Sequence, residues 1–218
     1  MRRGRAGRWG PRSPAPRLGN AGILGSCAAG RDGVRVGTGN LDPLRRSPGE
    51  VCFPGGKSEA ADKDEIDTAL REAKEEVGLQ PEEVEVVCRL VPGLDKMNHL
   101  VTPVVGFIED TFQATPNPDE VSDVFVVPLE YFIKPLKYRT LPYKTSSGHL
   151  SRMHCFTYDD HERNMSFKIW GLTAHFAVFL ALVIFGRRPT FEVDYDLDNL
   201  IPSSVQNFMN LYASIVFL

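Results

Sequence analysis

The pattern of apolar and polar positions predicts a domain that mixes strands and helices. Three runs rich in β-branched and aromatic residues are typical of strands: Val84–Val91, Val101–Ile108 and Asp123–Val127. Two further runs, Met153–Tyr158 and Ser166–Trp170, flank the sequence DDHERN and predict a β-hairpin. Strands interleaved with a few helices indicate an α/β or α+β domain.

Apolar residues at helical spacing predict a first helix between two capping residues. It would begin near Asp62–Asp64, where an aspartate caps the first amides, and end at Gly78. The side chains that recur on one face and would turn to the core are Ile66, Ala69, Leu70, Ala73 and Val77.

The longest apolar run, Leu172–Phe185, predicts a buried core helix. It is too short to cross a bilayer, which requires about 20 apolar residues. Thr173 is the expected N-cap, and Gly186 is expected to end the helix. His175 lies within the run and is expected to be a hydrogen-bonded core residue rather than a ligand. A final helix is expected after Ser203–Ser204.

Composition is that of an ordinary globular protein. The 218 residues suit one domain with a sizeable core, and a net charge of −3 gives no sign of a nucleic-acid partner. The four cysteines form no CxxC pair, which argues against a disulfide framework or a zinc site and favours a reducing compartment. The histidines outside the core helix show no ligand spacing: His99, His149, His154 and His161.

The first 44 residues differ from the rest of the chain. They hold 10 of its 19 glycines, and seven arginines but no acidic residue precede Asp32. With so few apolar side chains to offset the ordering entropy, we expect residues 1–44 to be disordered, with at most a weak strand at Gly33–Val36. An Arg-rich, acid-poor start is typical of mitochondrial transit peptides, but its glycines and prolines interrupt any amphipathic helix, so an alternative first exon is the competing interpretation.

Three glutamates share one face of the first predicted helix. Glu72, Glu75 and Glu76 stand at i, i+3 and i+4, and Glu65 extends the row by two turns. Like charges at this spacing cost about 0.2–0.5 kcal/mol per pair, and a hard divalent cation would remove that cost. The competing interpretation is a solvated acidic face that Arg71 and Lys74 partly neutralise.

A glycine turn, Phe53-Pro54-Gly55-Gly56-Lys57, stands just ahead of this helix. Such a turn can present a backbone carbonyl to a metal and bring amides and a lysine close to phosphate. Carboxylates combined with a phosphate cradle are what metal-assisted hydrolysis of a diphosphate needs.

Residues 71–79, REAKEEVGL, match the core of the Nudix box, R-E-(apolar)-x-E-E-x-G-(apolar), so the chain resembles the Nudix hydrolase family. The earlier half of the box departs from the usual G-x5-E-x7-R-E. Asp62 stands in place of the first glutamate, and eight residues rather than seven separate it from Arg71. The role of Asp62 is therefore left open.

A second element narrows the resemblance to the coenzyme A diphosphatase subfamily. Residues 45–56, RRSPGEVCFPGG, fit R-x3-G-x3-F-P-G-G, and residues 116–125 and 170–174 are also similar to that group. The resemblance implies a Nudix fold over residues 45–210, which is an α/β fold with a mixed sheet sandwiched between helices. It also implies Mg²⁺- or Mn²⁺-dependent hydrolysis of coenzyme A and acyl-CoA esters to adenosine 3′,5′-bisphosphate and (acyl-)4′-phosphopantetheine.

The resemblance also implies a role for each residue of the site. Glu72 and Glu76 would be metal ligands, Glu75 would share the metal or position water, and the Gly55 carbonyl would complete the metal shell. Arg71 would hold the carboxylates by ion pairing, a bidentate role for which lysine is a poor substitute. The residues implied beyond the helix are Glu120 as a further carboxylate that binds metal or acts as base, and Arg45, Gly56 and Lys57 as contacts to the substrate.

Both ends of the chain depart from the subfamily. The L-L-T-x-R element expected upstream of Arg45 is absent, which predicts that early strands of the sheet are missing. Residues 211–218 form an apolar tail without the SKL-like signal of the peroxisome that the resemblance implies, so cytosol and mitochondrion stay open.

These departures leave two alternatives to an active coenzyme A diphosphatase. One is a catalytically impaired Nudix isoform that binds nucleotide or regulates a full-length partner. The other is a Nudix hydrolase that prefers another nucleoside diphosphate. The intact Glu72, Glu75 and Glu76 favour an active enzyme.

Overall fold

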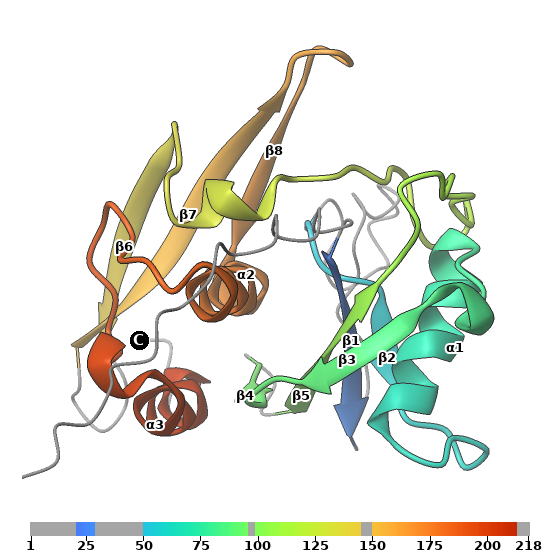
Figure 1. Ribbon diagram of the computed structural model, residues 1–218, viewed down its shortest axis with the longest axis horizontal. Coiled ribbons are helices and arrows are strands. Elements are labelled where there is room, and N and C mark those ends of the chain that lie inside the picture. Colours follow the sequence, from blue (N-terminus) through green and yellow to red (C-terminus); the bar gives the residue numbers. More distant parts are fainter. Residues whose placement is uncertain (1–20, 29–49, 96–98, 145–149, 213–218) are drawn as a thin grey trace, which may run out of the picture.

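The computed structural model of the chain describes residues 21–28, 50–95, 99–144 and 150–212. Its strands form two sheets that stand on either side of a central helix, with a further helix on the outer face of the first sheet (Figure 1). The observed order is therefore helix, sheet, helix, sheet, a mixed arrangement of the α/β kind that the sequence predicts.

The first sheet has the strand order β2-β1-β5-β3. Its members are β1 (Ala21–Ala28), β2 (Gly55–Lys57), β3 (Glu85–Arg89) and β5 (Leu100–Phe107), and the two-residue strand β4 (Gly93–Leu94) also pairs with β5. The pair β1–β2 is parallel, whereas β5 is antiparallel to its neighbours. The predicted strands Val84–Val91 and Val101–Ile108 are thus confirmed, with a bulge between Val86 and Cys88.

Strand β1 corrects the expectation of disorder for residues 21–28 and supplies an early strand that the sequence predicts to be missing. Residues Ala21–Ala28 pair along their full length with β5 and also join β2, so this strand lies inside the sheet. The backbone ladder on both sides stabilises a segment whose glycine-rich composition gives little strand signal. The rest of that segment, including Gly33–Val36, lies outside the described residues.

The second sheet is antiparallel and has the order β6-β7-β8. It comprises β6 (Tyr138–Lys144), β7 (Leu150–Asp160) and β8 (Met165–Trp170). Strands β7 and β8 form the hairpin predicted around DDHERN, and β7 is longer than expected. Asp194 fixes the later chain to β7, since its carboxylate accepts hydrogen bonds from the Arg152 amide and guanidinium, both at 3.1 Å.

Helix α2 (Gly171–Phe185) separates the two sheets and is buried along most of its length. It begins directly after β8, with Trp170 at the capping position, so the prediction of Thr173 as N-cap is wrong. Gly171 adopts a φ of 65°, a left-handed conformation that lets the chain turn from strand into helix without a longer connection. Gly186 ends the helix as predicted.

The last helix, α3 (Leu200–Tyr212), begins earlier than the expected start after Ser203–Ser204. A 3₁₀ turn, η3 (Leu197–Asn199), leads into it, and the Asp196 side chain caps that turn by accepting from the Asp198 amide. The capping aspartate, not the serine pair, therefore sets the start of the helix. Ser203 instead donates from its hydroxyl to the Leu200 carbonyl within the helix.

Helix α1 (Glu65–Val77) covers the outer face of the first sheet. The side chains packed between them include Ala69, Ala73, Val77 and Val104. On the opposite face of β5, Val101 and Val105 join the larger core around α2. Strand β5 is thus buried on both faces, with the α1 cluster on one side and the main core on the other.

The prediction of a strand at Asp123–Val127 is wrong, because this segment pairs with no strand among the described residues. Its side chains explain the apolar pattern: Phe125 stacks on Phe167 with ring centroids 3.7 Å apart. The Val124 carbonyl accepts from the Arg163 guanidinium at 3.1 Å instead of joining a ladder. The segment leads into a 3₁₀ turn, η2 (Leu129–Phe132).

None of the helices in the described ranges has the combination of length and apolar composition that a membrane crossing requires.

Candidate active site

The carboxylates of α1 lie against the glycine turn that precedes the helix. The Gly55 amide donates to the buried Glu76 carboxylate at 3.4 Å, across 21 residues of sequence. At Gly56 the fit is tighter, because a Cβ atom built on this residue would overlap the Glu72 carboxylate. Glycine at position 56 therefore leaves room for the Glu72 carboxylate, which any side chain there would displace.

Caps at both ends set the position of α1. Asp64 accepts hydrogen bonds from the amides of Ile66 and Asp67, as an N-cap does. Gly78 ends the helix in the left-handed conformation, with a φ of 76°. The predicted boundaries of this helix are confirmed to within a residue or two, so the three glutamates share one face as expected.

Arg71 joins the loop and the helix carboxylates. Its Nε and Nη2 atoms donate to the two oxygens of Asp62 at 3.1 and 3.0 Å, and Nη2 also donates to the Lys57 carbonyl at 2.8 Å. Its Nη1 atom donates to Glu72 at 3.0 Å and to Glu75 at 3.3 Å. Hydrogen bonding to Asp62 raises the pKa of Arg71 above its usual value. This arginine occupies a fixed position between β2 and two of the candidate ligands.

Asp62 is the residue whose role the sequence left open, and it binds Arg71. Its carboxylate accepts the bidentate pair from Arg71 and further hydrogen bonds from the Thr68 hydroxyl and the Glu59 amide, both at 2.9 Å. The hydrogen bonds from Arg71 lower the pKa of Asp62 to about 2. Asp62 is thus a positioning residue for Arg71.

Negative charge is concentrated around Glu72. Burial raises the pKa of Glu72, Arg71 opposes this effect, and the nearby carboxylates of Glu75 and Glu120 raise the pKa further. Glu120 belongs to a different part of the chain, so the fold brings it within electrostatic range of the helix glutamates. A cation at this point would relieve the repulsion among these groups.

The loop that carries Glu120 is fixed to the C-terminal end of α1. The Thr115 amide donates to the Val77 carbonyl and the Asn117 amide to the Glu76 carbonyl, both at 2.9 Å. The Glu120 amide then donates to the Asn117 carbonyl at 3.0 Å, which closes a tight turn. Sequence reasoning missed Asn117 as the residue that places Glu120, although an Asn between two prolines is a recognisable turn signal.

The donor groups suit a hard divalent cation. Carboxylate and carbonyl oxygens from Gly55, Glu72, Glu75, Glu76 and Glu120 are the ligand type that Mg²⁺, Mn²⁺ and Ca²⁺ take. In the part of the chain that is described, no three Asp, Glu, His or Cys side chains already converge as a preformed metal cluster. Glu72 and Glu75 are instead held by Arg71, so binding of a cation would require these side chains to reorient toward it.

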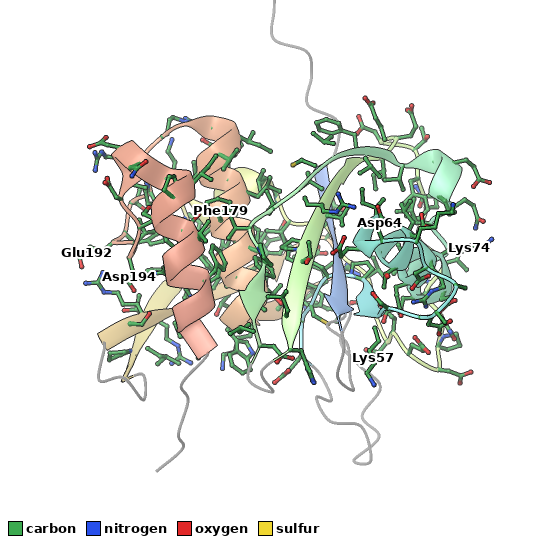
Figure 2. The ribbon with its side chains drawn as sticks, turned by 90° about the horizontal axis from the view of Figure 1, so that it is seen from below. Lys57, Asp64, Lys74, Phe179, Glu192 and Asp194 are labelled. Atoms are coloured by element: carbon green, nitrogen blue, oxygen red, sulfur yellow. The ribbon has the colours of Figure 1, made fainter. Side chains whose placement is uncertain are left out.

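Three further residues are predicted to belong to the site: Glu65, Lys57 and Arg45. Glu65 does not extend the acidic row of the site, because Arg89 of β3 pairs with it at 3.2 Å. Lys57 follows the glycine turn, and its side chain extends outward from the α1 end of the molecule, opposite Glu192 and Asp194 (Figure 2). Arg45 lies outside the described residues.

His175 is a core residue, as expected. It is buried, and its Nδ1 atom lies 3.2 Å from the Tyr195 hydroxyl. His154 is buried beside it, with ring centroids 4.6 Å apart, and its Nδ1 lies 2.8 Å from the Tyr138 hydroxyl. Both belong to the packing between the second sheet and α2, apart from the α1 carboxylates.

Comparisons with known proteins identify the family of the chain. Residues 39–146 match the NUDIX domain. The chain is 51% identical over 172 residues to a mouse protein named peroxisomal coenzyme A diphosphatase NUDT7, an alignment that covers 79% of this chain and 72% of the mouse protein.

More distant relatives include plant and bacterial proteins. The chain is 43% identical over 150 residues to Nudix hydrolase 15, mitochondrial, of Arabidopsis thaliana, covering 68% of this chain and 52% of that protein. It is 38% identical over 131 residues to an uncharacterized Nudix hydrolase NudL of Photorhabdus laumondii, covering 60% and 66% respectively. The chain spans about half of the length of the plant relative. The chain belongs to the Nudix hydrolase family.

Proposed function

We propose that the chain hydrolyses the diphosphate of coenzyme A and its acyl esters, giving adenosine 3′,5′-bisphosphate and (acyl-)4′-phosphopantetheine. The observation that carries this proposal is the 51% identity, over most of both chains, to a mouse protein named as a coenzyme A diphosphatase. The arrangement of Glu72, Glu75 and Glu76 against the Gly55–Gly56 turn supports it, because diphosphate hydrolysis needs clustered oxygen donors.

Nudix hydrolases generally require a divalent metal, and we propose Mg²⁺ or Mn²⁺ for this one. Glu72, Glu76 and Glu75 would hold the ion, with the Gly55 carbonyl completing its shell. When bound, such an ion polarises phosphoryl oxygens and lowers the pKa of a water molecule. Arg71 keeps the carboxylates on one face, through its bonds to Asp62, Glu72 and Glu75.

Hydrolysis needs a base that accepts a proton from the attacking water, in addition to the groups that hold the metal. Water adds to phosphorus, the bridging P–O bond breaks, and one proton leaves the attacking water. We assign the acceptance of that proton to Glu120. This carboxylate is close enough to help raise the pKa of Glu72, and hydrogen bonds hold its loop at the end of α1. Lys57 and Arg45 would bind phosphate oxygens of the substrate.

The experiment is product analysis of purified protein incubated with coenzyme A and Mg²⁺ in ¹⁸O-labelled water. Equal amounts of adenosine 3′,5′-bisphosphate and 4′-phosphopantetheine, with the label in one of them, would support the proposal. Release of free phosphate, or cleavage of ADP-ribose in preference to coenzyme A, would instead favour a Nudix hydrolase with another substrate.

The mouse relative is named as peroxisomal and the plant relative as mitochondrial. We propose the peroxisome for this chain as well. A fluorescent protein fused to its N-terminus should co-localise with a peroxisomal marker, and cytosolic or mitochondrial fluorescence would contradict the proposal.

A further inference from the structure

A cavity of about 600 Å³ is lined by residues from the chain segments that carry the candidate site, including Pro54 and Val77. This volume falls in the range of small-molecule sites, which is about 300–1,000 Å³. Its walls are mainly apolar and include Phe53, Val77, Val124, Phe125, Leu129 and Ala177. The segment between β5 and η2, which crosses from the α1 side to the β8 side in Figure 1, supplies much of its rim.

Three parts of the chain connect this cavity directly to the candidate site. Pro54 lines the cavity and precedes Gly55, and Val77 lines it and follows Glu76. Pro116 and Asp123 line it on either side of the turn that carries Glu120. If a cation on the site carboxylates bound a diphosphate, these three shared segments would bring one of its two substituents toward the cavity.

Charge decides which substituent of coenzyme A fits. The ionisable side chains that line the cavity are acidic or weakly acidic, namely Glu109, Asp110, Asp123 and Cys52, and its described lining includes no lysine, arginine or histidine. The 3′-phosphoadenosine arm carries an extra phosphate, which these carboxylates would repel. The pantetheine arm and an acyl chain carry no charge and suit apolar walls.

Asp123 also offers a hydrogen-bond acceptor of the right kind. Its Oδ1 atom accepts from Arg163 at 2.8 Å, whereas its buried Oδ2 atom has no hydrogen-bond partner among the described residues. A buried acceptor without a partner is unfavourable. The pantetheine arm carries two amide N–H groups, which are the donor type that this oxygen lacks.

We propose that this cavity binds the pantetheine arm and the acyl chain of coenzyme A esters, and that the 3′-phosphoadenosine arm stays outside it. The identity of the ligand rests on the proposed function, but the binding can be measured without hydrolysis. The cavity then determines which acyl chains the enzyme accepts.

The test is calorimetric titration of the full chain with S-octanoyl-pantetheine in the presence of EDTA. The wild type should bind this uncharged probe, and saturating adenosine 3′,5′-bisphosphate should leave its affinity unchanged. Ala114→Trp, which fills the cavity from its rim, should weaken binding by at least about tenfold. Thr111→Trp is the matched control, because Thr111 lies in the same segment but does not line this cavity.

A second pair of variants covers the case in which Ala114→Trp fails to fold. Val126 lines the cavity with 64% of its surface exposed, and Val87 of β3 is 51% exposed and does not line it. Val126→Asp should weaken binding of the probe, and Val87→Asp should not.

Absence of binding to the wild type, equal binding by the cavity variants, or displacement of the probe by the bisphosphate would each overturn the proposal. Hydrolysis of coenzyme A is assayed separately. Binding without hydrolysis would leave the cavity assignment intact and count against the proposed function. Hydrolysis of coenzyme A combined with unchanged probe binding by the cavity variants would support the proposed function and overturn the cavity assignment.

Discussion

At the scale of single residues, the site depends on the close contact between Gly56 and the Glu72 carboxylate. The Glu72 carboxylate occupies the space where a Cβ of residue 56 would stand. We therefore expect Gly56→Ala to displace Glu72 and to lower kcat/KM for coenzyme A by about 10²-fold, because small displacements of catalytic groups have effects of this size. Steady-state kinetics over a range of Mg²⁺ concentrations would measure this, and activity close to the wild type would show that the position of Glu72 is not critical.

The Asp62–Arg71 pair gives a pH-dependent contribution to stability. The folded pKa of Asp62, about 2, lies below its usual value of 3.8, so the pair stabilises the fold above about pH 4 and loses its effect as pH falls toward 2. After allowance for solvent screening, we expect a contribution of about 1–2 kcal/mol. Urea unfolding of wild type and Asp62→Asn between pH 5 and 2.5 measures it.

The stability difference between the two proteins should shrink as the pH falls. The exposed Asp119→Asn serves as the matched control and should show little difference from the wild type at any pH. A difference of constant size for Asp62→Asn would mean that Asp62 acts through packing rather than through its charge.

At the scale of elements, the N-cap of α1 supports the helix without belonging to the chemistry. Asp64 caps two amides and pairs with Arg89 at 2.6 Å. We expect Asp64→Ala to lower the free energy of unfolding by about 1 kcal/mol, and Asp64→Asn, which keeps the cap, to lower it less. Thermal denaturation measures both, and kcat should change little in either variant. A large loss of kcat in Asp64→Asn would show that this end of the helix takes part in the reaction.

Elements with strong local signals could be predicted from the sequence. Helix α1 has an aspartate cap, an apolar stripe and a terminal glycine, and the β7–β8 hairpin has two patterned strands around a turn. Strand β1 could not be predicted, because Ala21–Ala28 is stabilised by pairing with β5 and β2 rather than by its own composition. The strand predicted at Asp123–Val127 is wrong because an apolar pattern does not by itself produce a strand. The apolar side chains of this segment pack on the core, but its backbone joins no ladder among the described strands.

The candidate site shows the same division. Glu72, Glu75, Glu76 and the glycine turn follow from the spacing of the motif. The hydrogen bonds of Asp62 to Arg71 depend on a loop conformation, and the approach of Glu120 depends on hydrogen bonds between its loop and the end of α1. Such long-range placements are properties of the assembled fold.

At the scale of the whole molecule, a buried histidine pair makes the packing around α2 sensitive to acid. Burial lowers the pKa of His154 to about 4 and that of His175 well below its usual value. Both stay neutral in the folded protein, so the unfolded state binds more protons below about pH 6.5 and stability falls with decreasing pH. For His154 alone we expect a loss of about 2 kcal/mol between pH 7 and pH 5.

Replacing this group should flatten the pH profile. His154→Gln removes the titration and keeps a polar partner for Tyr138, so its stability should change less between pH 7 and pH 5 than that of the wild type. Urea unfolding at the two pH values measures the difference, with the exposed His161→Gln as control. Parallel profiles for wild type and His154→Gln would contradict the assignment of acid sensitivity to this pair.

The central claim is that the α1 carboxylates against the glycine turn form the site that cleaves coenzyme A. The most direct measurement is kcat/KM for coenzyme A, with Mg²⁺, in wild type, Glu76→Gln and the exposed control Glu82→Gln. We predict that Glu76→Gln loses at least about 10²-fold while remaining folded, and that Glu82→Gln matches the wild type. Equal activity of Glu76→Gln and wild type would contradict the claim, because the buried carboxylate at the centre of the arrangement would then have no part in the reaction.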